Sequence, residues 1–551
     1  MGSYGPDGPW QALAMNIGTF VDLESNTESP LLTPMWPAFE AYYMSAVITD
    51  KGGGKYAVDN STTAVKTRLQ TGVFPGALGQ GRVVFDIMGI VPKAGTRADI
   101  TLNTSIAAAD MWVYTLPDGR NYPAEVGILG LGDTGLSSEI IFGNATPPAI
   151  IQSLHTLGKI ASMSACWHIG SAPLQQPGSF VLGGYDQSRA IGQVGEFSWD
   201  TVGGSTMFLL DVFIGTDPVG NSVIPEYEGS IWQNASISGT ASSVIKMRGG
   251  KAGSVMVSLD ATTPYINLPL GVCEEAARRL PVFWDAGIGL YLWNTTNPQY
   301  TRIVQSPAYL AFVFADRNAK NLTILVPMLL LNLTLESPIV STPTPYFPCK
   351  PLNSTGGEWG LGRAFLQAAF VANRPDLNRT FLAQAPGPHV GQSVIRELQP
   401  TDTTFQTLPP DEFMRSWSQT WIITPPEDRG GLSTASIVGI SVGAVSALVL
   451  MLVGVWLWRR HRTGSQADDP DGQDGDSRGD RKESKDGGLV EMEGDSGVKM
   501  KSELGVDLPL EMEAPAQERQ ELSPQTFYYE LPVESPPEYR KSSDVKHGDP
   551  S

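Results

Sequence analysis

Apolar and polar residues alternate over short distances through most of the chain. Segments such as ADITLNTSI (98–106), GSFVLGGYD (178–186) and KMRGGKAGSVMVSLD (246–260) carry brief β-branched and aromatic runs bounded by turn residues. This pattern is typical of short strands joined by tight turns. Helical periodicity is sparse and is clearest over residues 147–158 and 272–284. The sequence therefore predicts a mostly β globular body.

A different pattern begins near the last quarter of the chain. Residues 435–458 contain no charged side chain, and Arg459, Arg460 and Arg462 follow directly. A run of this length can cross a bilayer as a tilted helix, and flanking basic residues favour the cytoplasmic side. We predict a single-pass type I membrane protein with an extracellular or lumenal ectodomain and a cytoplasmic C-terminus. A buried core helix is the alternative.

The distribution of glycosylation sequons agrees with this topology. Asn-X-Ser/Thr occurs nine times before the predicted span, and residues 459–551 contain no asparagine. Glycans are added to such sites in the secretory pathway, so the one-sided distribution predicts a glycoprotein ectodomain. The predicted sites are Asn60, Asn103, Asn144, Asn234, Asn294, Asn321, Asn332, Asn353 and Asn378.

The chain opens with MGSYGPDGPWQ, which has neither the basic nor the apolar region of a signal peptide. We expect a signal peptide upstream of this start. The alternative is that the predicted span acts as its own insertion signal.

Composition narrows the function classes further. The chain has 551 residues and a net charge of −19, which argues against binding to a nucleic acid backbone.

Residues 459–551 are acidic and poor in apolar side chains, so we predict a disordered tail. Residues 401–434, polar and proline-containing, are predicted to form a stalk. The five histidines and three cysteines show no metal-ligand spacing, so we predict no metal and no cofactor.

Two short motifs suggest protein partners. Gly439 and Gly443 form a GxxxG pattern, which lets two membrane helices approach closely and suggests a homodimer. Pro536, Pro537 and Tyr539 match PPxY, a polyproline II element that WW domains bind. A plain proline-rich linker is the alternative for the second motif.

Several segments, taken in chain order, resemble the pepsin-like aspartic peptidase family. They are PWQALAMNIGTF (9–20), VGILGLG (126–132), PPAIIQSLHTLGKI (147–160), GSFVLGGYDQSR (178–189), VMVSLDATTPYINLP (255–269) and GEWGLGRAFLQAAFVAN (357–373). The resemblance covers about residues 9–390. Within the family, the chain is similar to membrane-anchored members of the fungal type. It implies a bilobal ectodomain, with an N-terminal lobe over residues 1–190 and a C-terminal lobe over 191–400. It also implies a disulfide between Cys273 and Cys349, which leaves Cys166 unpaired.

The family's chemistry needs two aspartates, one from each lobe, that share a proton. Asp260 matches the second catalytic loop, but Ala261 and Thr262 stand where the family has a hydroxyl residue and glycine. In the first loop region the nearest acid is Asp22, and no Asp-Thr-Gly follows it.

Two other aspartates do not fit the position of the first loop. Asp86 lies too far along the lobe to be the first catalytic residue. Asp133, although it begins an Asp-Thr-Gly, belongs to the segment after GILGLG and is predicted to be a turn residue.

These patterns lead to one principal hypothesis and two alternatives. We expect a membrane glycoprotein whose aspartic-peptidase-like ectodomain no longer cleaves and instead binds a peptide or cell-surface ligand between its lobes. The first alternative is an active membrane-anchored endopeptidase that uses Asp260 with a partner such as Asp22. The second is a structural cell-surface or wall protein in which the fold is only a scaffold.

Overall fold

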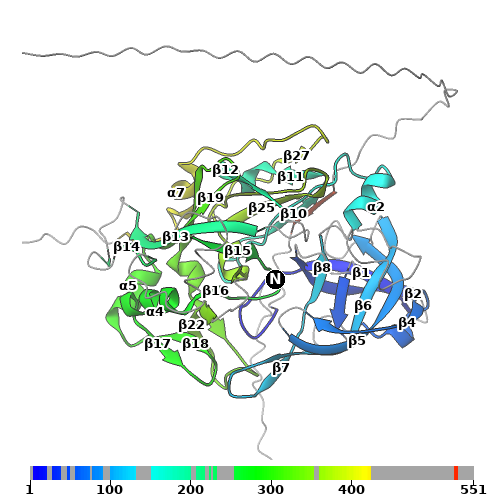
Figure 1. Ribbon diagram of the computed structural model, residues 1–551, viewed down its shortest axis with the longest axis horizontal. Coiled ribbons are helices and arrows are strands. Elements are labelled where there is room, and N and C mark those ends of the chain that lie inside the picture. The colour runs from blue at the N-terminus through cyan, green and yellow to red at the C-terminus, as the bar shows by residue number, and fades with distance from the viewer. Residues whose placement is uncertain are drawn as a thin grey trace, which may run out of the picture. The chain divides into compact units, whose positions relative to one another are not determined.

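The computed structural model describes thirteen stretches of the chain (Figure 1). They are residues 4–21, 28–38, 46–49, 56–74, 77–90, 100–131, 150–199, 206–217, 223–224, 228–232, 254–352, 359–423 and 527–530. Two compact units divide the chain, residues 1–426 with 522–551 and residues 427–521. All described residues belong to the first unit.

The predicted mostly β body is confirmed. A first eight-stranded sheet, drawn in blue and cyan in Figure 1, has the order β4-β5-β1-β2-β8-β3-β6-β7. Its strands are β1 (Leu13–Val21), β2 (Glu28–Ala38), β3 (Ala46–Thr49), β4 (Val65–Phe74), β5 (Ala77–Ile90), β6 (Ile100–Thr115), β7 (Asn121–Pro123) and β8 (Gly127–Gly130).

A second eight-stranded sheet, drawn mostly in green, has the order β20-β19-β13-β15-β24-β16-β23, and β14 pairs with β13. Its strands are β13 (Thr206–Thr216), β14 (Gly229–Ser230), β15 (Val255–Leu259), β16 (Ile266–Pro269), β19 (Ala308–Ala315), β20 (Asn321–Pro327), β23 (Cys349–Leu352) and β24 (Trp359–Leu361).

The two sheets share a five-strand arrangement. In the first sheet β1, β2, β8, β3 and β6 are neighbours in that order, and in the second β13, β15, β24, β16 and β23 follow the same order. The directions also agree: the successive pairs are antiparallel, parallel, antiparallel and parallel in both sheets. Each strand of one sheet's motif therefore has a counterpart in the other.

Three smaller sheets complete the β structure. A six-stranded sheet has the order β12-β26-β25-β9-β10-β28, a four-stranded sheet the order β17-β18-β22-β21, and β11 pairs with β27. The strands are β9 (Ala165–His168), β10 (Ser179–Leu182), β11 (Gly184–Asp186), β12 (Ile191–Ser198), β17 (Val282–Asp285), β18 (Leu290–Trp293), β21 (Leu333–Leu335), β22 (Thr344–Phe347), β25 (Ala369–Arg374), β26 (Arg379–Gln384), β27 (Ile395–Glu397) and β28 (Phe527–Glu530).

Helices are few and short, as the sequence pattern indicates. They are α2 (Ile150–Thr156), α4 (Leu270–Arg279), α5 (Pro298–Val304), α6 (Arg363–Leu366) and α7 (Glu412–Trp417). The first predicted helix, 147–158, corresponds to α2. The second, 272–284, is too long at its C-terminal end, because Pro281 cannot continue a helix and residues 282–285 form β17.

Part of the predicted stalk, 401–434, belongs to the folded body. Leu408 bridges to Ile191, and α7 with the turn after it buries Phe413, Trp417 and Trp421. The rings of Trp417 and Trp421 stack with their centroids 5.2 Å apart. The described part of this segment, up to residue 423, is therefore packed, and residues 424–434 lie outside the described residues.

Within the stretches that the structure describes, no helix is both long and apolar enough to span a membrane. The predicted span, 435–458, lies outside them, as do Gly439 and Gly443. In the predicted tail the structure describes only β28, which pairs antiparallel with β10.

The predicted disulfide between Cys273 and Cys349 is present, with their Cα atoms 5.7 Å apart. It joins α4 to β23 in the buried core, and Cys166 is a free, buried thiol. Burial raises the pKa of the Cys166 thiol far above its usual value, so this thiol is unreactive.

We expect the Cys273→Ala/Cys349→Ala double variant to lose about 2–4 kcal/mol of unfolding free energy, because the unfolded chain is no longer cross-linked. The closed loop spans 76 residues. Chemical denaturation with and without reductant measures the effect. Reductant should lower the stability of the wild type but leave the double variant unchanged, and equal stability of both proteins without reductant would contradict the prediction.

Candidate functional site

Asp260 lies directly after β15, where the parallel pair β15–β24 ends. Its backbone N–H donates to the carbonyl of Leu361, 3.1 Å away, which fixes the start of the loop. The Oδ1 atom accepts hydrogen bonds from the backbone N–H of Thr262, at 2.9 Å, and from the Thr262 hydroxyl. Thr262 thus keeps the backbone donor expected at the glycine position and adds a second one. No hydrogen bond to Oδ2 is found among the described residues.

The environment of Asp260 favours its neutral form. Burial raises the pKa of the Asp260 carboxyl, and the hydrogen bonds from Thr262 and the nearby charge of Arg363 oppose this rise. In its neutral form this carboxyl can donate as well as accept a hydrogen bond.

The side chain of Arg363 holds the Asp260 loop in place. Its Nη1 donates to the carbonyl of Ala261 at 2.8 Å, and its Nη2 lies 3.4 Å from a carboxylate oxygen of Asp7. The guanidinium also stacks over the ring of Trp10, 4.9 Å from its centroid. Trp10 Nε1 donates to Asp7 at 2.8 Å, so the charged pair and the indole form one buried cluster.

The segment before β1 binds the second half of the chain. Backbone N–H groups of Thr334 and Glu336 donate to the carbonyls of Gly8 and Pro6, and the Tyr346 hydroxyl donates to the carbonyl of Asp7. We call residues 4–12 the N-terminal strap.

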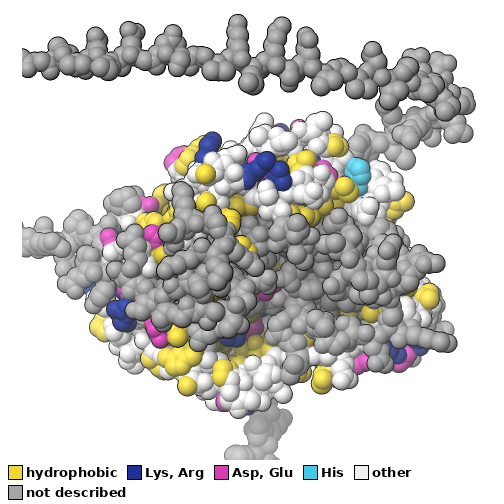
Figure 2. Space-filling model, viewed as in Figure 1, with side chains coloured by type: hydrophobic (Ala, Val, Ile, Leu, Met, Phe, Trp, Pro, Cys, Tyr) yellow, Lys and Arg dark blue, Asp and Glu magenta, His cyan; other side chains and the backbone are white. Residues whose placement is uncertain are grey.

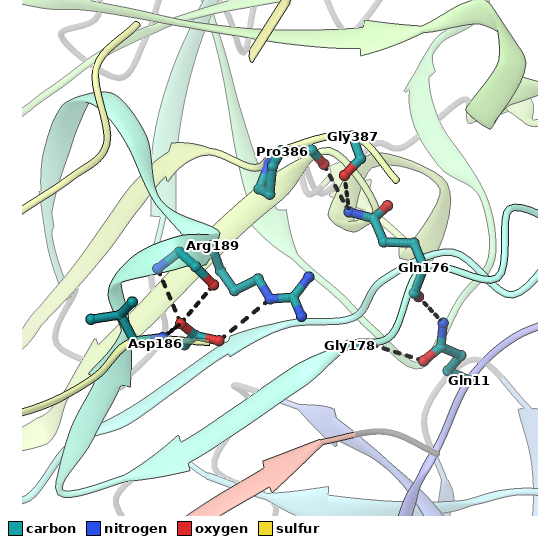
Figure 3. Close-up of polar contacts among 9 residues, drawn as sticks. Gln11, Gln176, Gly178, Asp186, Arg189, Pro386 and Gly387 are labelled. Atoms are coloured by element: carbon teal, nitrogen blue, oxygen red, sulfur yellow. Dashed lines mark hydrogen bonds and ion pairs between the residues drawn. The ribbon is translucent and has the colours of Figure 1, made fainter. Parts of the chain in front are cut away.

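The strap is also tied to the loop between β9 and β10. Figure 3 shows the Gln11 side chain accepting from the backbone N–H of Gly178 at 2.9 Å and donating to the carbonyl of Gln176. The Gln176 side chain in turn donates to the carbonyls of Pro386 and Gly387, both at 2.9 Å. Three distant segments are therefore held together by two glutamine side chains.

The repeated strand motif locates the counterpart of Asp260. Leu361 pairs with Leu259 on one side and Ile266 on the other, and Leu129 pairs with Pro37 and Ala46 in the same way. Both leucines precede a glycine. The residue after Leu259 is Asp260, so its counterpart after Pro37 is Ala38.

Neither Ala38 nor the residue before it supplies a carboxylate. If the match between the two motifs were shifted by one residue, Pro37 would correspond to Asp260, and the side chain of Pro37 also carries no titratable group. The sequence alone did not point to Ala38, because the residues around it do not match the Asp-Thr-Gly motif of a catalytic loop.

Asp22 itself lies outside the described residues, but the strand before it is described. Val21 pairs with Glu28 at the start of β2, whereas Ala38 is the last residue of that strand. At about 3.3 Å per residue, the ten steps from Glu28 to Ala38 span up to about 33 Å. The register therefore puts the start of the β1–β2 connection far from the counterpart of Asp260.

Asp86 has a structural role. The buried carboxylate accepts hydrogen bonds from the hydroxyls of Tyr56, Ser61 and Thr63 and from the backbone N–H of Ile87. Four donors satisfy a buried carboxylate without a metal or a second acid.

Most of the sequon asparagines that the structure describes are exposed. Five of the described asparagines are exposed, namely Asn60, Asn103, Asn294, Asn321 and Asn378. Asn332 is partly buried and accepts a hydrogen bond from Tyr300. Asn144, Asn234 and Asn353 lie outside the described residues, as do Asp133, Pro536, Pro537 and Tyr539.

The described side chains also bear on metal and polyanion binding. No group of three or more metal-ligating side chains occurs among them. On the face shown in Figure 2, their acidic and basic side chains lie interspersed rather than in a basic strip.

Comparison with protein-family models and with curated proteins finds no match for this chain. Its function must therefore be inferred from the residues and their geometry.

We expect Asp260→Asn to stabilise the protein at neutral pH and to have little effect near pH 3. The folded-state pKa of Asp260 is raised, so its neutral form is favoured by folding. The stability that this preference contributes is full below the usual value of about 3.9 and is lost as the pH rises through the raised pKa. An asparagine keeps the neutral form at every pH. Denaturation curves at pH 3 and pH 7 measure the difference.

Asp59→Asn is the matched control for this prediction. Asp59 is exposed, and its hydrogen bonds from Lys66 and Arg82 lower its pKa, so its substitution should show the opposite sign at neutral pH. A destabilising effect of Asp260→Asn at pH 7 would contradict the assigned environment of Asp260.

Proposed function

We propose that this chain is a type I membrane glycoprotein whose two-lobed, pepsin-like ectodomain binds peptide segments without cleaving them. The observation that carries the proposal is the pairing of Asp260 with Ala38 as counterparts in the two strand motifs. The second motif has an aspartate directly after β15, and the first has an alanine at the corresponding position at the end of β2.

Peptide hydrolysis by this type of site needs two carboxylates a few ångströms apart. One of them is ionised and activates a water molecule, while the other stays protonated and donates to the substrate carbonyl. A lone carboxyl such as Asp260 cannot hold both protonation states at once. It can still accept or donate a hydrogen bond, which suits binding.

The alternative of an active endopeptidase is less well supported. It requires a partner acid beside Asp260, and the register places Val21, the last described residue before Asp22, at the opposite end of β2 from Ala38. The alternative of a purely structural surface protein has no specific observation in its favour.

We expect the purified full-length protein, in detergent, to show no pepstatin-sensitive cleavage of denatured casein between pH 3 and pH 6. The described counterpart of Asp260 in the first strand motif is Ala38, which has no carboxyl with which Asp260 could share a proton. Peptide release is followed by mass spectrometry, with pepsin as the positive control. Cleavage that pepstatin blocks and that Asp260→Ala abolishes would overturn the proposal.

The membrane part of the proposal rests on the charge-free run at 435–458 and on the one-sided sequons. The exposure of five described sequon asparagines and the disulfide are consistent with a lumenal or extracellular body. The GxxxG and PPxY motifs stay predictions for a homodimer and for a WW-domain partner.

The β10–β28 pairing and a type I topology exclude each other within one chain. A span at 435–458 would place β10 and Phe527–Glu530 on opposite sides of the bilayer. The proposed topology therefore requires that β28 leaves β10 in the membrane-inserted protein.

We expect tail epitopes to be digested by protease added to the cytoplasmic side of sealed microsomes, while the glycosylated body stays protected. Endoglycosidase treatment should reduce the mass of the protected fragment. The register pair Val181 and Tyr528 provides the opposing test. A disulfide formed in cells by Val181→Cys/Tyr528→Cys, absent in a Val181→Cys/Ser523→Cys control, would contradict the proposed topology.

A further inference from the structure

Two neighbouring isoleucines end the described part of the body on its way to the predicted membrane span. Ile422 and Ile423 are 59% and 43% exposed, and they follow α7 and the turn after it. Single apolar side chains are common on protein surfaces, so what matters is where this pair lies and what it can contact.

The two isoleucines are held against the body. The backbone N–H of Ile422 donates to the carbonyl of Gln305, 2.8 Å away and directly after α5. The preceding Trp421 is buried, with its ring stacked on Trp417 and edge-on to Phe413, whose centroid is 6.1 Å away. The last turn therefore has a fixed place on the surface of the body, and its exposed apolar side chains are part of that surface.

The chain between this turn and the predicted span is short. Eleven residues, 424–434, separate Ile423 from Ala435. Eleven residues reach about 40 Å when fully extended, and a flexible chain of this length averages about 20 Å between its ends. A globular body of about 400 residues has a radius of gyration of about 21 Å. A bilayer that holds the span is therefore within reach of the side of the body that carries Ile423.

Basic side chains near the pair suit a surface that bears phosphate groups. Arg302 is exposed and lies three positions before Gln305, so both side chains share one face of α5. On α7, Arg415 pairs with Asp411 at 2.6 Å and with Glu412 at 2.8 Å, which offsets part of the acidic charge there. A lipid headgroup layer binds protein surfaces that combine exposed apolar and basic side chains in this way.

We propose that the surface formed by Ile422, Ile423 and Arg302 rests on the lipid headgroups of the extracellular or lumenal leaflet. The isoleucine side chains enter the boundary between headgroups and acyl chains, and the guanidinium binds lipid phosphate. This inference rests on the membrane part of the proposed function and names the partner of one surface of the body.

Quenching by lipid tests the inference on the full-length protein. A fluorophore on Gln305→Cys is measured in vesicles of phosphatidylcholine and phosphatidylserine that contain a lipid spin-labelled near its headgroup. Cys166 is buried and Cys273–Cys349 is a disulfide, so background labelling is low. We expect strong quenching at position 305 and little at Leu157→Cys, because Leu157 follows α2, far from α5 and α7 in Figure 1.

The double variant Ile422→Ser/Ile423→Ser separates docking from tethering. The span and the linker stay unchanged in it, so a label that is near the lipid only because of the tether would stay quenched. We expect the variant to lose most of the quenching at position 305. Val65→Ser/Leu157→Ser removes two similarly exposed apolar side chains elsewhere and should leave the quenching unchanged. Thermal unfolding of each variant verifies that it is folded.

Alkaline extraction of the vesicles distinguishes failure of this inference from failure of the proposed function. If alkali releases the chain, no span holds it, and the membrane part of the proposed function fails together with the inference. If the chain stays in the membrane but Ile422→Ser/Ile423→Ser keeps full quenching, or positions 305 and 157 are quenched alike, the docking surface is overturned and the topology stands. Energy transfer between two labelled copies without lipid quenching also overturns it, because a second copy then covers the surface.

Discussion

The guanidinium of Arg363 joins the parts of the molecule that are farthest apart in sequence. It donates to the carbonyl of Ala261, lies against the carboxylate of Asp7 and covers the ring of Trp10. A buried charge of this kind is stable only while its counter-charge and its hydrogen bonds stay in place. The position of the Asp260 loop therefore depends on the N-terminal strap, although the strap forms no part of the second sheet.

The sequence alone was sufficient to predict the class of fold, but not the register in which the strands pair. Short β-branched runs predicted the strands around 98–106, 178–186 and 246–260, and the disulfide followed from the family resemblance. Tertiary packing determined the rest. Helix α4 ends at Arg279, because Pro281 cannot continue it. The aromatic side chains of the predicted stalk, Phe413, Trp417 and Trp421, are buried in the folded body, and no local sequence pattern indicates this.

The candidate site illustrates the same limit. Asp260 was found through the resemblance of its segment to a known loop, whereas Ala38 could be recognised only after both strand motifs were aligned through their pairing.

The contact between Asp7 and Arg363 also has a consequence for biosynthesis. The two residues are 356 positions apart in the chain. A ribosome adds about 5–20 residues per second, so the strap waits on the order of tens of seconds for its partner to be made. During that time Trp10 and Asp7 lack the groups that bury them in the finished protein. Although the strap is made long before Arg363, it is therefore among the later segments to reach its final position.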